Sequence, residues 1–299
     1  MSEGTNHGKI TRRTFLNASL AVAGGILALR PCRTVGAAEP KHARWAFLSD
    51  THIAIDQENN YRGFYPYRNL HKAIEQIAGD VPEGAVVTGD LARLTGQMGD
   101  YENLRGLLTP LVGKRPIHLA LGNHDHRANF LDAFETLAGP REAIKDKYVV
   151  TVDAGPARFI LLDSLFSTDQ TSGLLGKAQR TWLAQYLQRS DDKPIILFFH
   201  HSLRDTDGDL LDPPRLFDII KPVTKVKALV YGHSHEYGFS QFEDIHLINL
   251  PATGYNFNDD QPVGWVEARL TTEGGEFILH ALGGNTQIDG RVDGLRWRS

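Results

Sequence analysis

From residue 44 to residue 237 the chain alternates between short apolar runs and segments with helical periodicity. The apolar runs each end in polar residues and span residues 44–52, 84–90, 117–125, 157–164, 194–201 and 228–235. The intervening segments repeat apolar side chains with the spacing of an amphipathic helix, over residues 67–78, 100–112, 127–138 and 176–188. After Tyr237 the pattern predicts strands joined by short turns, over residues 239–244, 246–253, 264–272 and 276–283.

Alternating strands and helices predict an α/β fold in which helices cover the sheets. We find no linker within residues 39–299, so these residues are predicted to form one domain. Nearly every polar cluster falls at the carboxyl end of a predicted strand, and α/β sheets place their ligand sites at such ends. The sequence therefore predicts a functional site at these strand ends.

Residues 1–38 have the order of an export signal. A pair of arginines at positions 12–13 precedes an apolar run over residues 18–29, and small residues follow as far as Ala38. The arginine pair resembles the twin-arginine class of signals, whose substrates cross the membrane already folded. A membrane anchor and an internal helix are the alternatives, but the run is shorter than the roughly 20 residues that span a bilayer.

Composition and charge refine this picture only slightly. The chain is 41% hydrophobic and 23% charged, as in ordinary soluble domains, and its net charge is −4. Removal of residues 1–38 would take away five of the 32 basic and one of the 36 acidic residues, leaving a net charge of −8. That charge opposes binding of a long polyanion, so no nucleic-acid partner is expected.

Cys32 is the only cysteine, and cleavage of the signal would remove it. The mature chain would then have no disulfide and no thiolate ligand or nucleophile. Cys32 follows Arg30 and Pro31 rather than the small and apolar residues of a lipoprotein signal. We therefore expect no lipid attachment and no stable membrane anchor after cleavage.

The polar residues at the strand ends are of the types that bind metal ions. They are Asp50, His52, Asp90, Asn123, His200, His233 and His235. Carboxylate, imidazole and amide ligands without thiolates suit Zn, Mn, Fe or Co. In an extended segment, side chains two residues apart point to the same side, so the D-x-H and H-x-H pairs are expected to act together. Seven ligands exceed what one ion with room for a substrate takes, whereas two ions that share a carboxylate would use them all.

Glycines precede three of these ligands. Gly89, Gly122 and Gly232 are expected to let the backbone turn tightly or approach an ion closely, because they carry no Cβ.

Taken in order, the motifs resemble those of the calcineurin-like metallophosphoesterases. The family pattern is D-x-H, GD, GNH(D/E), H and G-H-x-H, and this sequence supplies every part between Asp50 and His235. The resemblance implies a four-layer α-β-β-α sandwich, with two mixed sheets flanked by helices and a dinuclear metal site at the strand carboxyl ends. It also implies attack of a metal-bound hydroxide on a phosphate ester. The arrangement is most similar to the cyclic-nucleotide and glycerophosphodiester phosphodiesterase branch.

The resemblance implies a role for each site residue. It assigns three ligands to each ion and one bridge: Asp50, His52 and His235 for the first ion, Asn123, His200 and His233 for the second, and Asp90 between them. His124 would contact the phosphate and assist departure of the leaving group, and Asp125 would orient His124. Asn123 would contact the substrate as well as its ion.

Two assignments stay open at this point. His200 and His201 are adjacent, and His200 is favoured as the ligand because the first histidine of such a pair binds the metal in the family. Arg93 stands where purple acid phosphatases carry a tyrosine ligand, so a tyrosine-bound ferric ion is not expected. Arg93 either binds a phosphate through the N–H groups of its guanidinium or is an ordinary surface arginine.

Four segments beside the motifs have less specific interpretations. The aromatic-rich residues 59–69 and the loop 254–265 either line a substrate pocket or pack as ordinary structure. His126 is expected to be an exposed loop residue. The acidic residues 205–209 have the composition of a calcium loop, but Leu216 stands at the twelfth position, where a glutamate is required, so calcium is not expected.

The sequence thus predicts an exported, periplasmic or extracellular enzyme with two metal ions that hydrolyses small phosphodiesters. The predicted partners are a small phosphoester and the twin-arginine export machinery. A phosphomonoesterase on the same site and a non-catalytic metal-binding protein are the alternatives. The sequence does not indicate the physiological substrate, the native metals or the oligomeric state.

Overall fold

The computed structural model describes residues 42–135 and 141–299. The predicted export signal and Cys32 lie outside the described residues, so export stays a prediction. Among the described helices, none combines the length and the apolar character needed to cross a membrane.

The described residues contain two six-stranded sheets. In spatial order, the first sheet consists of β12 (Val292–Arg296), β11 (Gly274–Gly284), β10 (Pro262–Leu270), β1 (Ala43–Leu48), β2 (Gly84–Val87) and β3 (Ile117–Leu119). The second consists of β4 (Val150–Asp153), β5 (Arg158–Leu161), β6 (Ile195–Phe198), β7 (Val226–Tyr231), β9 (Ile245–Asn249) and β8 (Gly238–Phe242). Both sheets are mixed: β1–β2–β3 and β5–β6–β7–β9 are parallel, whereas β10, β4 and β8 pair with them antiparallel.

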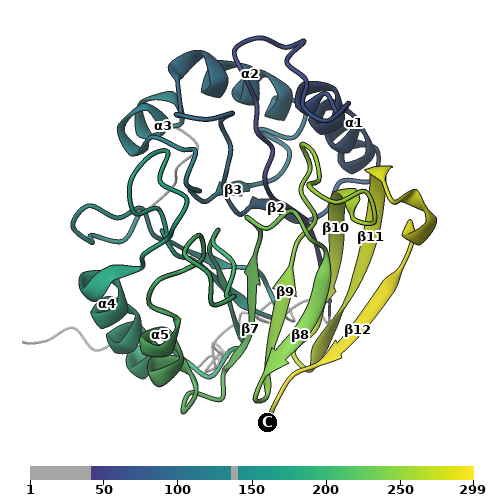
Figure 1. The fold of residues 1–299 in the computed structure, drawn as a ribbon. Coiled ribbons are helices and arrows are strands. Elements are labelled where there is room, and N and C mark those ends of the chain that lie inside the picture. The colour runs from purple at the N-terminus through teal and green to yellow at the C-terminus, as the bar shows by residue number, and fades with distance from the viewer. Residues whose placement is uncertain (1–41, 136–140) are drawn as a thin grey trace, which may run out of the picture. The chain divides into compact units, whose positions relative to one another are not determined.

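Helices flank both sheets, as Figure 1 shows. They are α1 (Pro66–Gly79), α2 (Met98–Leu108), α3 (Arg127–Ala133), α4 (Gly176–Arg189) and α5 (Pro213–Ile220), with a short 3₁₀ helix at Thr286–Ile288. The buried side chains of α1, α2 and α3 join the core of the first sheet, and those of α4 and α5 pack on the second. The predicted four-layer α-β-β-α sandwich is confirmed.

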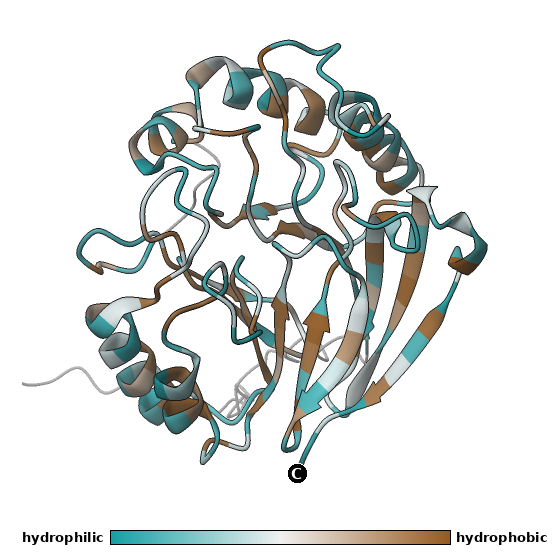
Figure 2. Ribbon diagram, viewed as in Figure 1, coloured by the Kyte–Doolittle hydropathy of each residue, from teal (hydrophilic) through white to brown (hydrophobic). Residues whose placement is uncertain are grey.

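The two sheets pack through an aromatic core. The rings of Phe47, Phe159 and Phe198 meet edge to face, with centroids 4.9 to 5.8 Å apart. In β5, Phe159 contributes to this core while Ile160 faces the core beneath α4 and α5. Because both faces of the strand are buried, the sequence reads as a continuous apolar run, and Figure 2 shows brown, hydrophobic colour on many of the inner strand segments.

Helix boundaries follow from local sequence. Pro66 occupies the first turn of α1, where its missing N–H costs nothing, and Leu70, Ile74 and Ile77 form the buried stripe. The second helix ends at Leu108, earlier than the predicted 112, because Pro110 cannot continue it. The predicted helix 127–138 is described only to residue 135, and α3 itself ends at Ala133.

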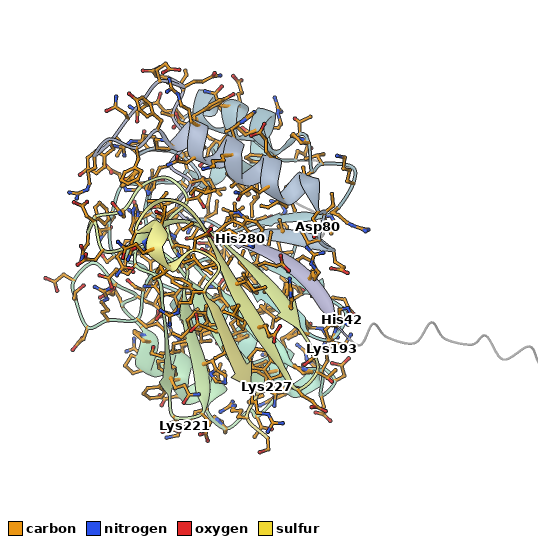
Figure 3. The ribbon with its side chains drawn as sticks, turned by 90° about the vertical axis from the view of Figure 1, so that its right-hand side faces the viewer. His42, Asp80, Lys193, Lys221, Lys227 and His280 are labelled. Carbon is orange, nitrogen blue, oxygen red and sulfur yellow. The ribbon has the colours of Figure 1, made fainter. Side chains whose placement is uncertain are left out.

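Polar contacts hold α1 against the outer face of the first sheet. Arg44 on β1 pairs with Asp80, which follows α1, at 2.8 Å between Nη2 and Oδ2, and with Glu267 on β10 at 3.1 Å. Asp80 and His280 are labelled in Figure 3, and the His280 ring stacks on Trp265 at 4.1 Å. Because Asp80 is largely exposed, its ion pair adds little stability. We assign these contacts a structural role.

Candidate active site

Five parallel strands deliver the predicted ligands to one place. Asp50 and His52 follow β1, Asp90 follows β2, and Asn123 follows β3, all in the first sheet. The second sheet supplies the rest from the ends of β6 and β7, namely His200, His233 and His235. Six of the seven side chains are buried, and His233 is half-buried. The predicted convergence at strand carboxyl ends is confirmed.

The backbone at these positions is left-handed, not extended. Positive φ angles occur at Asp50 (51°), His52 (47°), Asp90 (48°), His233 (71°) and His235 (55°). The argument that paired ligands lie in an extended segment was therefore wrong. Such angles cost on the order of 1–3 kcal/mol each and persist where the surroundings enforce them. Here hydrogen bonds from Asp50 N to Gly89 O (3.0 Å) and from His52 N to Asp90 O (2.9 Å) hold the turn.

The glycines allow this close approach. A Cβ at Gly122 would lie 2.2 Å from Oδ1 of Asp90, and one at Gly232 would lie 2.3 Å from Oδ2 of Asp50. Gly89 has a φ of +129°, which side chains rarely adopt. The expectation for these three positions is confirmed.

The first cluster contains Asp50, His52 and His235. The Nε2 atoms of His52 and His235 are 3.1 Å apart, and Oδ1 of Asp50 lies 3.3 Å from Nε2 of His235. The Nδ1 atoms of the two imidazoles face backbone carbonyls, that of His52 at Arg93 (3.4 Å) and that of His235 at Tyr255 (2.6 Å). Because a carbonyl can only accept, each Nδ1 carries a proton, and the neutral form of each ring turns the lone pair of Nε2 toward the other ring.

Two facing lone pairs repel unless a positive charge lies between them. Donor atoms bound to one ion at roughly 2.0–2.1 Å are about 3 Å from each other, which is the separation found here. Carbonyl partners on the outer nitrogen are also usual for metal-binding histidines. The residues of the first cluster therefore fit a metal ion.

The second cluster contains Asn123, His200 and His233. Nε2 of His200 lies 3.2 Å from Oδ1 of Asn123 and 3.2 Å from Nδ1 of His233. Nε2 of His233 donates to the carbonyl of Gly208 at 2.9 Å, which leaves the lone pair on the inner nitrogen, Nδ1, free to bind an ion. The two 3.2 Å separations match those of atoms bound to one ion, so this cluster also fits a metal ion.

Asp90 lies between the two clusters. Its Oδ1 is 3.3 Å from Nε2 of His200, and its Oδ2 is 3.6 Å from Nε2 of His52. One carboxylate therefore faces a ligand of each group, which is the geometry that a bridging ligand requires. The described residues thus contain clusters that could hold a dinuclear metal site.

The electrostatics of the site favour cations. Burial raises the pKa of both Asp50 and Asp90, but the neighbouring histidines outweigh burial and hold each pKa well below its usual range. Burial lowers the pKa of His52 to about 3 and that of His233 to about 4, so both rings stay neutral. For His200, burial lowers the pKa, yet the carboxylates of Asp90 and Asp50 raise it to about 9. Two buried carboxylates therefore demand positive charge, which metal ions would provide.

The geometry favours His200 over His201 as the ligand. His201 turns Nδ1 to the Ser164 hydroxyl at 2.8 Å and is fully buried, while Nε2 of His200 faces Asn123 and Asp90.

His124 reaches the site from the segment after Asn123. Its Nδ1 lies 2.8 Å from the carbonyl oxygen of Leu94, and its Nε2 is 4.0 Å from Oδ2 of Asp90. The backbone N–H of His124 donates to Oδ1 of Asp90 at 2.9 Å. The ring is partly exposed and lines the pocket described below.

The prediction that Asp125 orients His124 was wrong. The carboxylate of Asp125 is buried and accepts hydrogen bonds from Leu91 N, Ala92 N, Gly122 N and the Tyr101 hydroxyl. Burial and Asp90 raise the pKa of Asp125 to about 6. Asp125 therefore ties together the loops after β2 and β3, and a backbone carbonyl holds the His124 ring.

Two further expectations need correction. Arg93 is half-buried, donates to Oδ1 of Asn59 at 3.1 Å and lies over the rings of Tyr61 (5.3 Å) and Tyr255 (5.5 Å). Of the two interpretations of Arg93, the geometry does not support the phosphate contact, because Arg93 is not among the residues that line the pocket described below and its guanidinium is engaged with these partners. His126 is not an exposed loop residue: it caps α3 by accepting from the backbone N–H of Asn129 at 3.3 Å.

A pocket of about 430 Å³ opens above the clusters. Besides site residues, it is lined by Thr171, Ser202, Arg204, Thr206, Gly208, Asp209, Ser234, Tyr255 and Phe257. Tyr255 and Phe257 come from the loop 254–265, so the pocket interpretation of that loop is confirmed. The insertion 59–69 instead packs behind the pocket, with Tyr61 against Tyr255 at 4.7 Å.

Sequence reasoning missed Arg204, Thr206 and Asp209 as pocket residues. The available signal was a run of charged and hydroxyl side chains directly after His200 and His201, which was considered only as a calcium loop. In the structure, Asp209 accepts from Thr206 N at 3.0 Å and shapes that loop.

Comparisons with known proteins agree with this geometry. A model of the family described as calcineurin-like phosphoesterase matches residues 43–237. The 3′,5′-cyclic adenosine monophosphate phosphodiesterase CpdA of Pseudomonas aeruginosa is 27% identical, over 70% of this chain and 76% of its own. The glycerophosphodiester phosphodiesterase GpdQ of Enterobacter lignolyticus is 26% identical, also over 70% of this chain and 76% of its own.

Solved structures share the fold. A dimetal phosphatase from Danio rerio superimposes with a TM-score of 0.67, at 17% identity, over 86% of this chain and 99% of its own. The ordered motifs, the two mixed sheets and the family match lead to one conclusion. This chain belongs to the calcineurin-like phosphoesterase family.

Proposed function

We propose that this chain is an exported phosphodiesterase that uses two metal ions to hydrolyse small phosphodiesters. The observation that carries the proposal is the position of Asp90, whose two oxygens face the two ligand clusters at a pocket of about 430 Å³. When bound, the ions supply Lewis acidity that neutralises phosphate charge and activates the attacking water. Homologues named as phosphodiesterases support a metal-dependent hydrolase of phosphoric esters.

His124 and Asn123 act on the substrate in this proposal. Nδ1 of His124 donates its N–H to the Leu94 carbonyl, which aims Nε2 at the site. The step needs the imidazolium form, whose Nε2–H hydrogen-bonds the phosphate and passes its proton to the leaving oxygen, so that the ring ends neutral with its proton on Nδ1. The carbonyl oxygen of Asn123 faces His200, so its amide nitrogen remains to donate to a phosphate oxygen.

The charge of the pocket favours a diester over a monoester. Among the described residues that line it, Arg204 is the only lysine or arginine, and Asp209 is also present. A diester carries one negative charge at neutral pH and a monoester carries nearly two. Beyond the two proposed ions, the lining adds one cationic side chain, and this modest positive charge supports the diester.

Export is proposed from the sequence of residues 1–38 alone. Its support is the order of the arginine pair, the apolar run and the small residues. Replacing Arg12 and Arg13 together with lysine should keep the protein in the cytoplasm, measured by cell fractionation. Unchanged export would contradict a twin-arginine signal.

The activity test compares bis(p-nitrophenyl) phosphate with p-nitrophenyl phosphate. The mature protein is loaded separately with Mn, Fe, Co or Zn, and a chelated sample is the control. Metal-dependent turnover that is faster on the diester supports the proposal. Preference for the monoester would make the protein a phosphatase, and two bound ions without turnover would make it a non-catalytic metal-binding protein.

A further inference from the structure

Phe257 presents an aromatic surface at the mouth of the pocket. It lies in the loop between β9 and β10, and 51% of the residue is exposed. One side of its ring covers the imidazole of His235, with centroids 4.2 Å apart and planes inclined by 25°. Because that side is covered and half of the residue is exposed, the rest of the ring is open to a ligand in the pocket that it lines.

A single exposed phenylalanine is ordinary on a protein surface, but the ring of Phe257 stands in the lining of the pocket beside the ligand clusters, where a bound ligand would cover it. The neighbouring aromatic residue is Tyr255, which is buried between the rings of His52 and His235. Tyr255 therefore packs against two of the metal-ligand imidazoles. Of these two aromatic residues, only Phe257 has an exposed ring that a substrate can contact. Arg204 and Thr206 line the same pocket; Arg204 pairs with Glu236, and the hydroxyl of Thr206 donates to Asp209.

We propose that Phe257 is a specificity-determining residue that stacks on a planar substituent of the diester, such as an aryl group or a nucleobase. Arg204 lines the same pocket and, besides its ion pair with Glu236, has further N–H groups that can donate to the polar edge of such a group. This inference rests on the proposed function, and it adds how the ester substituent is recognised. Stacking of this kind tolerates different rings, because each presents a flat π-face.

The competing explanation is that Phe257 only supports His235. If Phe257 only supports His235, its removal should change the metal content and should change the kinetics of every substrate equally. If Phe257 stacks on the substrate, its removal should weaken the binding only of substrates with a planar group. The two roles therefore differ in their expected measurements.

The experiment measures KM and kcat of the metal-loaded enzyme for bis(p-nitrophenyl) phosphate and for glycerophosphoethanolamine, which lacks a ring. For Phe257→Ala we expect KM for the aryl diester to rise about tenfold with kcat little changed, because stacking on a base or ring is a binding interaction. KM for glycerophosphoethanolamine should change by less than about twofold. Phe257→Trp should restore binding. Phe166→Ala, which removes an aromatic residue of similar exposure (45%) that does not line the pocket, should behave as the wild type.

Equal losses on both substrates, a lower metal content or no effect would each overturn the inference. If the wild-type enzyme with two bound ions hydrolyses neither diester, the proposed function fails. The inference about Phe257 is then tested by calorimetry, which measures the binding of ligands with and without a ring. Adenosine 5′-monophosphate should then bind Phe257→Ala about tenfold more weakly than wild type, and glycerol 3-phosphate should bind both equally. Equal weakening of both ligands, or of neither, overturns it.

Discussion

The Nδ1 atom of His124 lies 2.8 Å from the carbonyl oxygen of Leu94. This contact fixes the imidazole by a backbone group, although an aspartate stands directly after His124 in the sequence. The carbonyl places a proton on Nδ1 and fixes the ring orientation, and the exposed carboxylate of Asp169 lies 3.8 Å from the same nitrogen.

His124→Ala should lower kcat for bis(p-nitrophenyl) phosphate by about 10²–10⁴-fold, the usual contribution of a positioned acid. Both ions should remain bound, because the ligand clusters do not need this ring. Metal analysis and steady-state kinetics check the two parts. His126→Ala is the matched control: it should cost about 1 kcal/mol as the loss of a helix cap and leave kcat nearly unchanged. Full activity of His124→Ala would contradict the proposed role.

Asp90→Ala should bind fewer than two ions per chain and lose turnover. Asp90 turns one oxygen toward His52 of the first cluster and the other toward His200 of the second, so its removal affects both ions. Metal content by mass spectrometry is the measurement, with the exposed Asp132→Ala as control. Retention of two tightly bound ions in Asp90→Ala would refute the bridging assignment.

His200→Ala and His201→Ala should differ in metal content. Both remove a fully buried ring and should lower the free energy of unfolding. Only His200 turns a nitrogen toward Asn123 and Asp90, so only its replacement should release an ion. The reverse result would assign the ligand to His201.

Gly232→Ala should destabilise the site. The added Cβ would lie 1.9 Å from Oγ of Ser49 and 2.3 Å from Oδ2 of Asp50, so either the backbone or the ligand must move. We expect a loss of about 1–3 kcal/mol, with weaker metal binding. Gly106→Ala in α2 meets nothing within 4 Å and should instead stabilise by up to about 1 kcal/mol. Thermal unfolding of both variants tests the contrast, and equal melting temperatures would contradict it.

His118 on β3 should make stability depend on pH. Burial lowers its pKa to about 4, from an ordinary value of 6.5, and its Nε2 has no partner among the described residues. The unfolded chain therefore takes up a proton more readily, so this stability is present above pH 6.5 and is lost as the pH falls toward 4. The full loss is about 3 kcal/mol at 1.36 kcal/mol per pKa unit. Urea unfolding gives the free energy of unfolding at pH 7 and at pH 5. The difference between these two free energies should be smaller for His118→Leu than for wild type, and an unchanged difference would exclude His118 as the cause.

The sequence alone determined the types of the candidate metal-ligand side chains, their order along the chain and most of the secondary structure. Continuous apolar runs predicted the central strands, because strands buried on both faces need apolar side chains throughout. The edge strands β4 and β12 were not predicted. The residues of β12 alternate between exposed and half-buried positions, and its pairing with β11 is what makes it a strand.

Only the tertiary structure decided how these ligand side chains are arranged around the site. His52 and His235 are 183 residues apart, and their Nε2 contact depends on strands from both sheets meeting at one rim. The left-handed backbone at the ligands, the carbonyl behind His124 and the open face of Phe257 likewise arise from contacts between distant segments. Local sequence specifies which side chains are available, because propensity and motif act over a few residues. Their distances, partners and exposure come from the packing of the two sheets, which no short stretch encodes.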